Sequence, residues 1–114
     1  MFGVGASLIC GATIVLRKKF SATNFLDEII KYECTSFSYV GEICRFLLNQ
    51  PKSRLDRAHK VKVCFGNGLR ENVHKEFTER FGIKCVELYG ATEGNILLAN
   101  RYKNLYSIRL KTYF

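Results

Sequence analysis

The sequence predicts an α/β fold, in which alternating helices cover a parallel sheet. Short runs of β-forming apolar residues alternate with amphipathic helical segments, and the connections between them are short. Such an alternation requires crossover connections, which run right-handed and leave the strands parallel. A length of 114 residues, with 47% hydrophobic and 25% charged residues, fits one globular domain.

The first expected elements are a short helix over residues 4–10 and a strand over residues 13–16. Residues 1–16 are apolar and uncharged, and glycines interrupt them. Membrane insertion is the alternative, because three basic residues follow at 17–19. A spanning helix needs about 20 apolar residues, however, and a signal peptide carries its basic residues in front of the apolar stretch. We therefore expect a core helix and a buried strand.

Ser21 is expected to cap the next helix, which has one apolar face. That face consists of Phe25, Leu26, Ile29, Ile30 and Tyr32. A strand over residues 35–39 follows, and then a helix over residues 42–49 that ends before Pro51. The inward residues of this second helix are expected to be Ile43, Phe46 and Leu47.

The remaining expected elements are a strand over residues 61–65, a helix over residues 70–81 and a strand over residues 83–88. Val73 and Phe77 mark the buried side of this third helix. Gly82 follows its last residue, where a glycine commonly ends a helix.

Two glycine-bearing segments follow the last two strands: Gly66-Asn67-Gly68 and residues 89–95. Because parallel sheets bind ligands outside the carboxyl ends of their strands, we expect both segments at one edge and in one pocket. The second segment reads Tyr-Gly-Ala-Thr-Glu-Gly-Asn, in which a threonine hydroxyl can donate to a phosphoryl oxygen and a glutamate can hold a magnesium ion. The alternatives are a solvated turn for this segment and a turn that needs glycine for its backbone angles for the first.

Residues 89–95 resemble the signature of AMP-forming acyl and aryl adenylating enzymes. Their alanine and Gly-Asn resemble one branch in particular, the fatty acid transport proteins, also called very long-chain acyl-CoA synthetases. Three further stretches carry the same resemblance in the same order, at residues 15–22, at residues 39–48, and at residues 66–70 with 76–82. The resemblance implies part of the large domain of an adenylating enzyme.

This resemblance also implies a two-step reaction that uses ATP, Mg²⁺ and coenzyme A. A long-chain fatty acid attacks the α-phosphate of ATP to give an acyl-adenylate and pyrophosphate, and coenzyme A then displaces AMP. Matched position by position, Thr92 would donate to the α-phosphate and Glu93 would hold the magnesium ion. The adenine and the acyl entrance would be framed by Tyr89, Gly90 and Ala91, and the adenine-contacting loop would be Gly66, Asn67 and Gly68.

The resemblance divides the chain into a partial AMP-binding domain, residues 1–95, and a basic, divergent tail, residues 96–114. The phosphate loop, the ribose-binding aspartate and the small C-terminal domain of that family have no counterpart in these 114 residues. We therefore expect a fragment that is inactive on its own. The alternative is a non-catalytic remnant that binds nucleotide weakly or binds only a protein partner.

The formal net charge is +8, and the tail contributes the basic residues Arg101, Lys103, Arg109 and Lys111. Nucleic-acid binding is one reading, because tyrosines are interleaved with these residues. Elsewhere the basic residues mostly alternate with acidic ones, as on solvated faces. We therefore expect no nucleic acid partner, and instead attraction to an anionic membrane surface on the cytosolic face of the endoplasmic reticulum or plasma membrane.

Neither a cysteine nucleophile nor a metal site made of cysteine and histidine is expected. The five cysteines include no Cys-x-x-Cys pair, and Cys64 and Cys85 lie in apolar strand-like runs, as buried thiols of a reducing compartment do. His59 and His74 are far apart and have no cysteine at ligand spacing. His74 is expected to face solvent from its helix.

Overall fold

The computed structural model describes residues 7–90 and 97–99. These residues form one sheet with the strand order β1-β2-β3-β4. The strands are β1 (Ser36–Val40), β2 (Val63–Asn67), β3 (Lys84–Gly90) and β4 (Leu97–Ala99). The first three run parallel, whereas β4 is antiparallel to β3. The expected parallel sheet is confirmed, and β4 adds a strand that the sequence did not predict.

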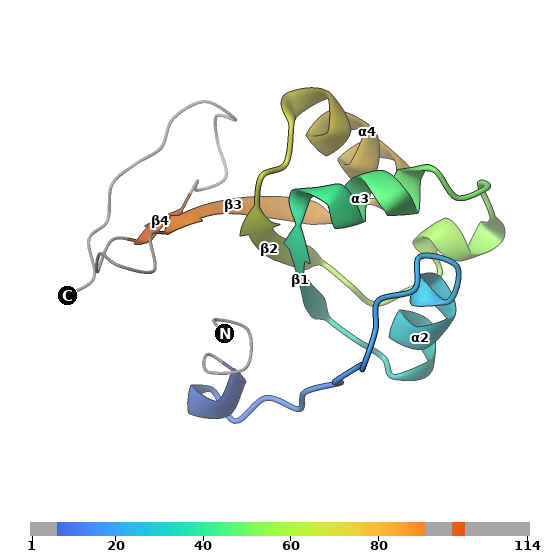
Figure 1. Ribbon diagram of the computed structural model, residues 1–114. Coiled ribbons are helices and arrows are strands. Elements are labelled where there is room, and N and C mark those ends of the chain that lie inside the picture. Colours follow the sequence, from blue (N-terminus) through green and yellow to red (C-terminus); the bar gives the residue numbers. More distant parts are fainter. Residues whose placement is uncertain (1–6, 91–96, 100–114) are drawn as a thin grey trace.

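The helices connect the parallel strands in the expected order. They are α2 (Phe25–Lys31) before β1, α3 (Gly41–Leu48) and the 3-10 helix η1 (Arg54–Arg57) between β1 and β2, and α4 (Glu71–Phe81) between β2 and β3. Figure 1 shows α3 and α4 next to each other on one side of the strands, and the two helices are in contact. The expected α/β alternation from α2 to β3 is therefore confirmed.

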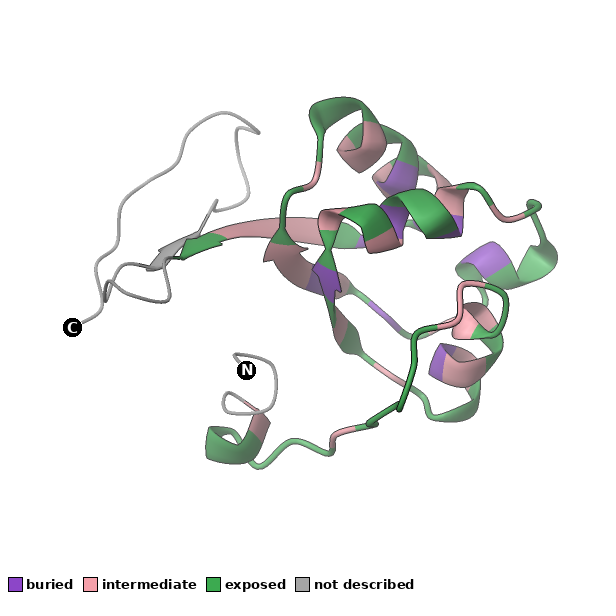
Figure 2. Ribbon diagram, viewed as in Figure 1, coloured by how far each residue is buried: buried purple, intermediate pink, exposed green. Residues whose placement is uncertain are grey.

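One hydrophobic core joins α2, α3 and α4 to the sheet. Its buried members are Ile29, Tyr39, Cys44, Leu47, Val61, Cys64, Phe77, Phe81 and Ile83. Figure 2 shows buried residues on α3, α4 and the strands, where these elements face one another. Phe37 extends the core, because its ring packs between Phe25 and Phe77 with centroid distances of 5.0 and 6.5 Å. These aromatic contacts connect α2 to α4 through Phe37 of β1.

The N-terminal segment differs from the expectations in its strand and in its burial. Residues 13–16 are not in a strand, and Leu16 is 74% exposed. A strand needs a neighbouring ladder for its backbone groups. Among the described residues, the sheet begins at β1 and no strand lies beside residues 13–16. The expected core helix is limited to residues 7–9 in the described part, where Leu8 and Ile9 are exposed.

Details of α2 and α3 also differ from the expectations. The N-cap of α2 is Asn24 instead of Ser21, although the Ser21 hydroxyl accepts a bond from the Asn24 amide at 3.4 Å. Tyr32 lies beyond the helix end and is exposed. In α3 the buried residues are Cys44 and Leu47, and Phe46 is exposed. Two steps along a helix rotate a side chain by about 200°, which places Phe46 opposite Cys44.

The helix α4 agrees closely with its prediction. Phe77 is fully buried and Val73 is half-buried. Gly82 ends the helix with a φ of 69°, in the left-handed region, and its amide donates to the Thr78 carbonyl at 2.9 Å. A glycine adopts this conformation without the steric strain of a side chain.

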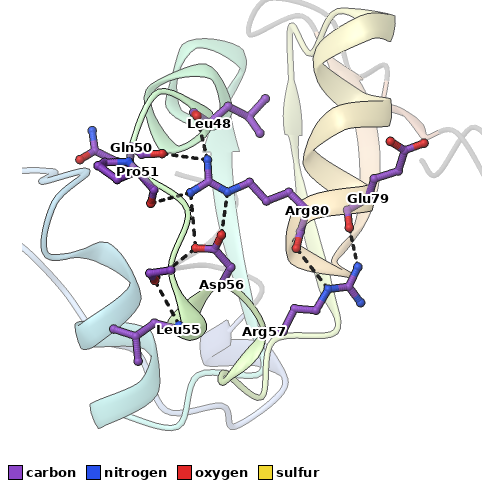
Figure 3. A network of polar contacts seen from close by, with 9 residues as sticks. Leu48, Gln50, Pro51, Leu55, Asp56, Arg57, Glu79 and Arg80 are labelled. Atoms are coloured by element: carbon purple, nitrogen blue, oxygen red, sulfur yellow. Dashed lines mark hydrogen bonds and ion pairs between the residues drawn. The ribbon is translucent and has the colours of Figure 1, made fainter.

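A buried ion pair fastens the end of α4 to the preceding elements. The Arg80 and Asp56 side chains are 8% and 9% exposed, and Arg80 Nε donates to Asp56 Oδ2 at 2.9 Å. The same guanidinium donates to the carbonyls of Leu48, Gln50 and Pro51 at 2.8, 2.9 and 3.0 Å. Figure 3 shows how these bonds converge on Arg80 from the end of α3 and from η1. The sequence analysis did not single out this pair.

The purified 114-residue chain is expected to self-associate. Among the described residues, no strand pairs with the outer edge of β1, and a hollow of about 610 Å³ lies between β1, α2 and residues 12–21. Unpaired edges and uncovered apolar surface promote association. Light scattering and near-UV circular dichroism on the purified chain test this expectation, and a monodisperse monomer with sharp tertiary signals would contradict it.

Candidate functional site

The two glycine-bearing segments lie at the same edge of the sheet. β2 and β3 run parallel, and their last paired residues are Gly66 and Glu87. The carboxyl ends of β2 and β3 therefore lie at the same edge of the sheet, which is the edge toward β4 in Figure 1. The expectation that Gly66-Asn67-Gly68 and the segment from Tyr89 onward share one edge is confirmed for the described residues.

Tyr89 and Gly90 do not begin a loop, as the sequence analysis expected. They belong to β3, where Tyr89 pairs with Leu98 and Gly90 pairs with Leu97 of the antiparallel strand β4. The Tyr89 side chain is 65% exposed. Ala91, Thr92 and Glu93 lie outside the described residues, in the stretch 91–96 that links the two strands.

Gly66 is required by the packing of the neighbouring strand. It lies in register with Tyr39 of β1, and a Cβ built on it would collide with the Tyr39 carbonyl oxygen. The same Cβ would lie 2.8 Å from Cδ2 of the Tyr39 ring, closer than carbon atoms approach without repulsion. A side chain at position 66 would therefore displace either β1 or the tyrosine ring.

Gly68 and Gly41 allow two strand-to-helix turns to touch. Gly68 has a φ of 77°, which a residue with a side chain rarely adopts. A Cβ on Gly41, the first residue of α3, would collide with the Gly68 carbonyl oxygen and lie 3.2 Å from its Cα. Backbone geometry therefore accounts for the glycines at positions 41, 66 and 68. This agrees with the alternative given above, in which the segment needs glycine for its backbone and not for a ligand. Gly66 and Asn67 belong to β2 and not to the turn that was expected after residue 65, because they pair with Tyr39 and Val40 of β1. Asn67 is exposed at the same edge.

Glu87 is a site residue that the sequence analysis missed. Its Oε1 accepts a hydrogen bond from the Leu69 amide at 3.2 Å and another, short one from the Tyr39 hydroxyl. Burial of Tyr39, together with its bond to Glu87, raises the pKa of this hydroxyl above its ordinary value. The hydroxyl therefore keeps its proton and acts as the donor. The available signal was the one carboxylate within the apolar run of β3, between Val86 and Leu88.

Two of the cysteine thiols, those of Cys44 and Cys64, are buried in the hydrophobic core. Cys64 is fully buried, and its thiol donates to the Cys85 sulfur at 3.3 Å. That bond and burial raise the pKa of Cys64, and burial raises the pKa of Cys44 to about 12. The expected burial is confirmed for Cys64, whereas Cys85 is half-buried and Cys10 is exposed. No group of three metal-ligating side chains occurs within residues 7–90 and 97–99.

Thiol reactivity should follow this burial. A thiol reagent such as 5,5′-dithiobis(2-nitrobenzoate) is expected to label Cys10 first and to leave Cys44 and Cys64 unlabelled until denaturant is added, because thiolates are the reactive species. Labelling of native protein followed by peptide mass spectrometry measures the order. Early labelling of Cys64 would contradict the described packing.

Two further surface features play no part in the site. His74 is half-buried on α4, more enclosed than the sequence analysis expected. Glu42 and Arg45 form an ion pair one turn apart on the surface of α3.

Within the described part of the chain, no helix has both the length and the apolar character needed to cross a membrane.

Comparison with known proteins decides the family. The model of the family described as "AMP-binding enzyme" matches residues 1–111. The chain belongs to the AMP-binding enzyme family. Human long-chain fatty acid transport protein 1 is 55% identical over 101 residues, which make up 88% of this chain and 16% of that protein. The medium/long-chain-fatty-acid–CoA ligase FadD6 of Mycobacterium tuberculosis is 52% identical over 98 residues, 85% of this chain and 16% of that protein.

Two solved structures have the same fold as this chain. The N-terminal domain of FACL13 from Mycobacterium tuberculosis matches with a TM-score of 0.70 and 24% identity, over 81% of this chain and 24% of that one. O-succinylbenzoate coenzyme A synthetase from Bacillus subtilis, solved in complex with AMP, matches with a TM-score of 0.67 and 25% identity, over 85% of this chain and 20% of that one. The resemblance to fatty acid transport proteins and to an adenylating-enzyme domain is therefore confirmed. The chain spans about one sixth of the length of its two relatives named above.

Proposed function

We propose that this chain is part of a long-chain or very long-chain fatty acid–CoA ligase that is coupled to fatty acid uptake. The observation that carries the proposal is the combination of 55% identity to a long-chain fatty acid transport protein with 52% identity to a fatty acid–CoA ligase. The shared edge of Gly66–Gly68 and the end of β3 supports it, because that edge is where a parallel sheet binds nucleotide.

The proposed roles of the edge residues follow from their chemistry. The exposed Asn67 amide can exchange hydrogen bonds with an adenine ring, and the exposed Tyr89 ring offers it an aromatic surface. Gly68 and Gly90 keep side chains away from this surface, and Gly66 leaves room for the Tyr39 ring. Ala91 would border the acyl entrance.

The proposed catalytic pair is Thr92 and Glu93. As the fatty acid carboxylate attacks, negative charge builds up on the α-phosphoryl oxygens, and a hydroxyl donor such as Thr92 would stabilise it. The oxygen ligands of a carboxylate suit Mg²⁺, so Glu93 would hold that ion. When bound, Mg²⁺ would neutralise phosphate charge. Thr92 and Glu93 are neighbours in the sequence and follow Gly90 closely, so both would act at the edge described above.

The membrane association and the division of the chain are also proposals. We propose that residues 1–95 contribute to the AMP-binding domain and that the basic residues of 96–114 are attracted to anionic lipid on the cytosolic face of the endoplasmic reticulum or plasma membrane. Residues 97–99, which follow this division closely, belong to the sheet as β4. Fatty acid, ATP and coenzyme A are the proposed substrates.

A ligase assay tests the proposed function. The full-length protein that contains this segment is incubated with ATP, Mg²⁺, coenzyme A and labelled oleate, and labelled oleoyl-CoA is the expected product. Reactions without ATP or without coenzyme A are the controls. A folded full-length protein that forms no acyl-CoA from oleate or from longer fatty acids would overturn the proposal.

The isolated 114-residue chain is expected to be inactive in the same assay, because positioning of a phosphoryl group depends on several protein groups acting as a unit. The chain carries about one sixth of the length of its relatives. Oleoyl-CoA formed by the isolated chain above the background of its own Glu93→Ala variant would contradict this expectation.

A further inference from the structure

Glu87 connects three strand ends at the edge of the sheet. Its carboxylate projects from β3, and one oxygen, Oε1, accepts from Tyr39 of β1 and from the amide of Leu69, directly after the Gly66–Gly68 turn. The Tyr39 hydroxyl lies also 3.4 Å from the Val86 carbonyl oxygen. A single carboxylate thus receives hydrogen bonds from the other two parallel strands or their continuations.

The register of the sheet explains how these groups meet. Tyr39, Gly66 and Glu87 are paired in one row across β1, β2 and β3. Side chains in one row of a parallel sheet point to the same face. Since Gly66 has no side chain, the tyrosine ring passes over β2 and reaches the carboxylate of β3. A Cβ at this position would lie 2.8 Å from the ring, so the tyrosine, the glycine and the glutamate form one unit.

We infer that Glu87 is a positioning residue of the nucleotide site, which holds the Gly66–Gly68 segment, at the end of β2, at a fixed place relative to Tyr89 and Gly90 of β3. The inference rests on the proposed function. Glu87 lies two residues before Tyr89 and bonds to the residue that follows Gly68, so it links β3, just before Tyr89, to the end of the Gly66–Gly68 segment.

Removing the carboxylate would release the turn. The Leu69 amide would lose its acceptor, and the Tyr39 hydroxyl, whose residue is 3% exposed, would keep only the Val86 carbonyl oxygen at 3.4 Å. Polar groups deprived of partners in such surroundings draw in water or shift. A displacement of about 1 Å in a positioning group can lower a rate about 10²-fold, so a small movement of the turn would be visible in kinetics.

The chemistry of the two bonds defines a conservative variant. Both donors reach one oxygen, and the amide oxygen of glutamine also has two lone pairs. Glu87→Gln therefore preserves both acceptor positions, whereas Glu87→Ala removes them. Tyr39→Phe keeps the ring over Gly66 and removes one of the two donors, so its effect should be intermediate.

The kinetic test uses the full-length protein and its pyrophosphate release. Glu87→Ala is expected to raise the KM for ATP about tenfold, the change that corresponds to one lost net hydrogen bond, while Glu87→Gln stays within about twofold of wild type. Glu76→Ala, which removes an exposed carboxylate from α4, is the matched control and should leave the KM unchanged. A merely structural role would lower the melting temperature of Glu87→Ala without changing the KM of the folded enzyme.

The outcomes separate this inference from the proposed function. A wild-type enzyme that is active, together with an unchanged KM for ATP in folded Glu87→Ala, would overturn the role of Glu87 alone. A folded wild-type protein without adenylation activity would overturn the proposed function and this role with it. Hydrogen exchange of the Leu69 amide gives a readout independent of activity: faster exchange in Glu87→Ala and wild-type exchange in Glu87→Gln support the inference, and equal rates in all three proteins contradict it.

Discussion

Asp56→Ala is expected to destabilise the domain that contains this segment by about 3–5 kcal/mol, because it leaves a buried guanidinium without its counter-charge. Arg80 would retain its bonds to backbone carbonyls, but these carry no full negative charge. Urea denaturation of the full-length protein measures the loss. Arg45→Ala, which breaks the exposed pair with Glu42, is the matched control and should change stability by no more than about 1 kcal/mol.

The double variant Asp56→Ala with Arg80→Leu sharpens this test. Removing both charges avoids an unpaired buried ion, so the double variant should be more stable than the sum of the two single losses indicates. Strict additivity of the single effects, or a loss for Asp56→Ala as small as that of the surface control, would contradict the assignment of Arg80 and Asp56 as a buried pair.

The same pair should make stability depend on acid. Burial alone would raise the pKa of Asp56, but hydrogen bonds from Arg80 and Ser53 and the charge of Arg80 outweigh it and hold the pKa below its ordinary value. A carboxyl whose pKa is lower in the folded state contributes stability above its unfolded pKa of about 3.9, and this contribution is lost as the pH falls through the folded pKa. Denaturation at pH 6 and at pH 3 measures the difference, which should be smaller in Asp56→Asn.

Thr92→Val and Glu93→Gln are each expected to lower the adenylation rate of the full-length enzyme about 10²-fold or more. Losing one donor to charge that develops in a transition state typically costs about 2.7 to 4 kcal/mol. Folding should hardly change if both side chains face the ligand as proposed, because substitutions outside a packed core usually shift stability by about 0.5 kcal/mol or less. Pyrophosphate release and thermal melting, measured on the same preparations, separate the loss of chemistry from the loss of fold.

Two substitutions elsewhere control for the chemistry of these changes. Thr13→Val and Glu76→Gln remove the same groups from exposed positions far from the proposed pair in sequence, and both should keep the wild-type rate. Wild-type rates in Thr92→Val and Glu93→Gln would instead leave Thr92 and Glu93 without a catalytic role, as the alternative of a solvated turn expected.

The elements from α2 to β3 could be predicted because each carries its own local signal. Gly82 ends α4 in the left-handed conformation that its position after an amphipathic helix indicates. The strand β2 was recognised from its apolar β-forming residues, and the parallel order followed from the alternation of strands with helices. These signals depend on residues adjacent in sequence, so they can be interpreted without knowledge of the rest of the fold.

The N-terminal strand was predicted wrongly because a strand depends on its neighbour. Residues 13–16 have the apolar, β-branched composition of a buried strand, but no strand lies beside them among the described residues. Composition indicates that a segment is able to form a strand, but a strand forms only where a neighbouring strand can hydrogen-bond to its backbone. The strand β4 was missed for the converse reason: it is only Leu97–Ala99, and its evidence is its pairing with the end of β3.

The edge of the sheet that carries the proposed site could be predicted, but the contacts across that edge could not. The two glycine-bearing segments were expected at one edge, and the parallel register of β2 and β3 confirms that edge. The row of Tyr39, Gly66 and Glu87 could not be predicted, because it depends on the register between three strands separated by helices. The Arg80–Asp56 pair was missed for a related reason, since its partners lie 24 residues apart.

The most direct test of the central claim is fatty-acid-dependent exchange of labelled pyrophosphate into ATP, catalysed by the full-length protein without coenzyme A. This exchange reports the reversible attack of a carboxylate on the α-phosphate and requires no later step. We expect labelled ATP with Mg²⁺ and a long-chain fatty acid present, and a loss of about 10²-fold or more in Glu93→Gln. A folded protein whose exchange is absent, or is the same with and without fatty acid, would contradict the assignment of this segment to a fatty acid–CoA ligase.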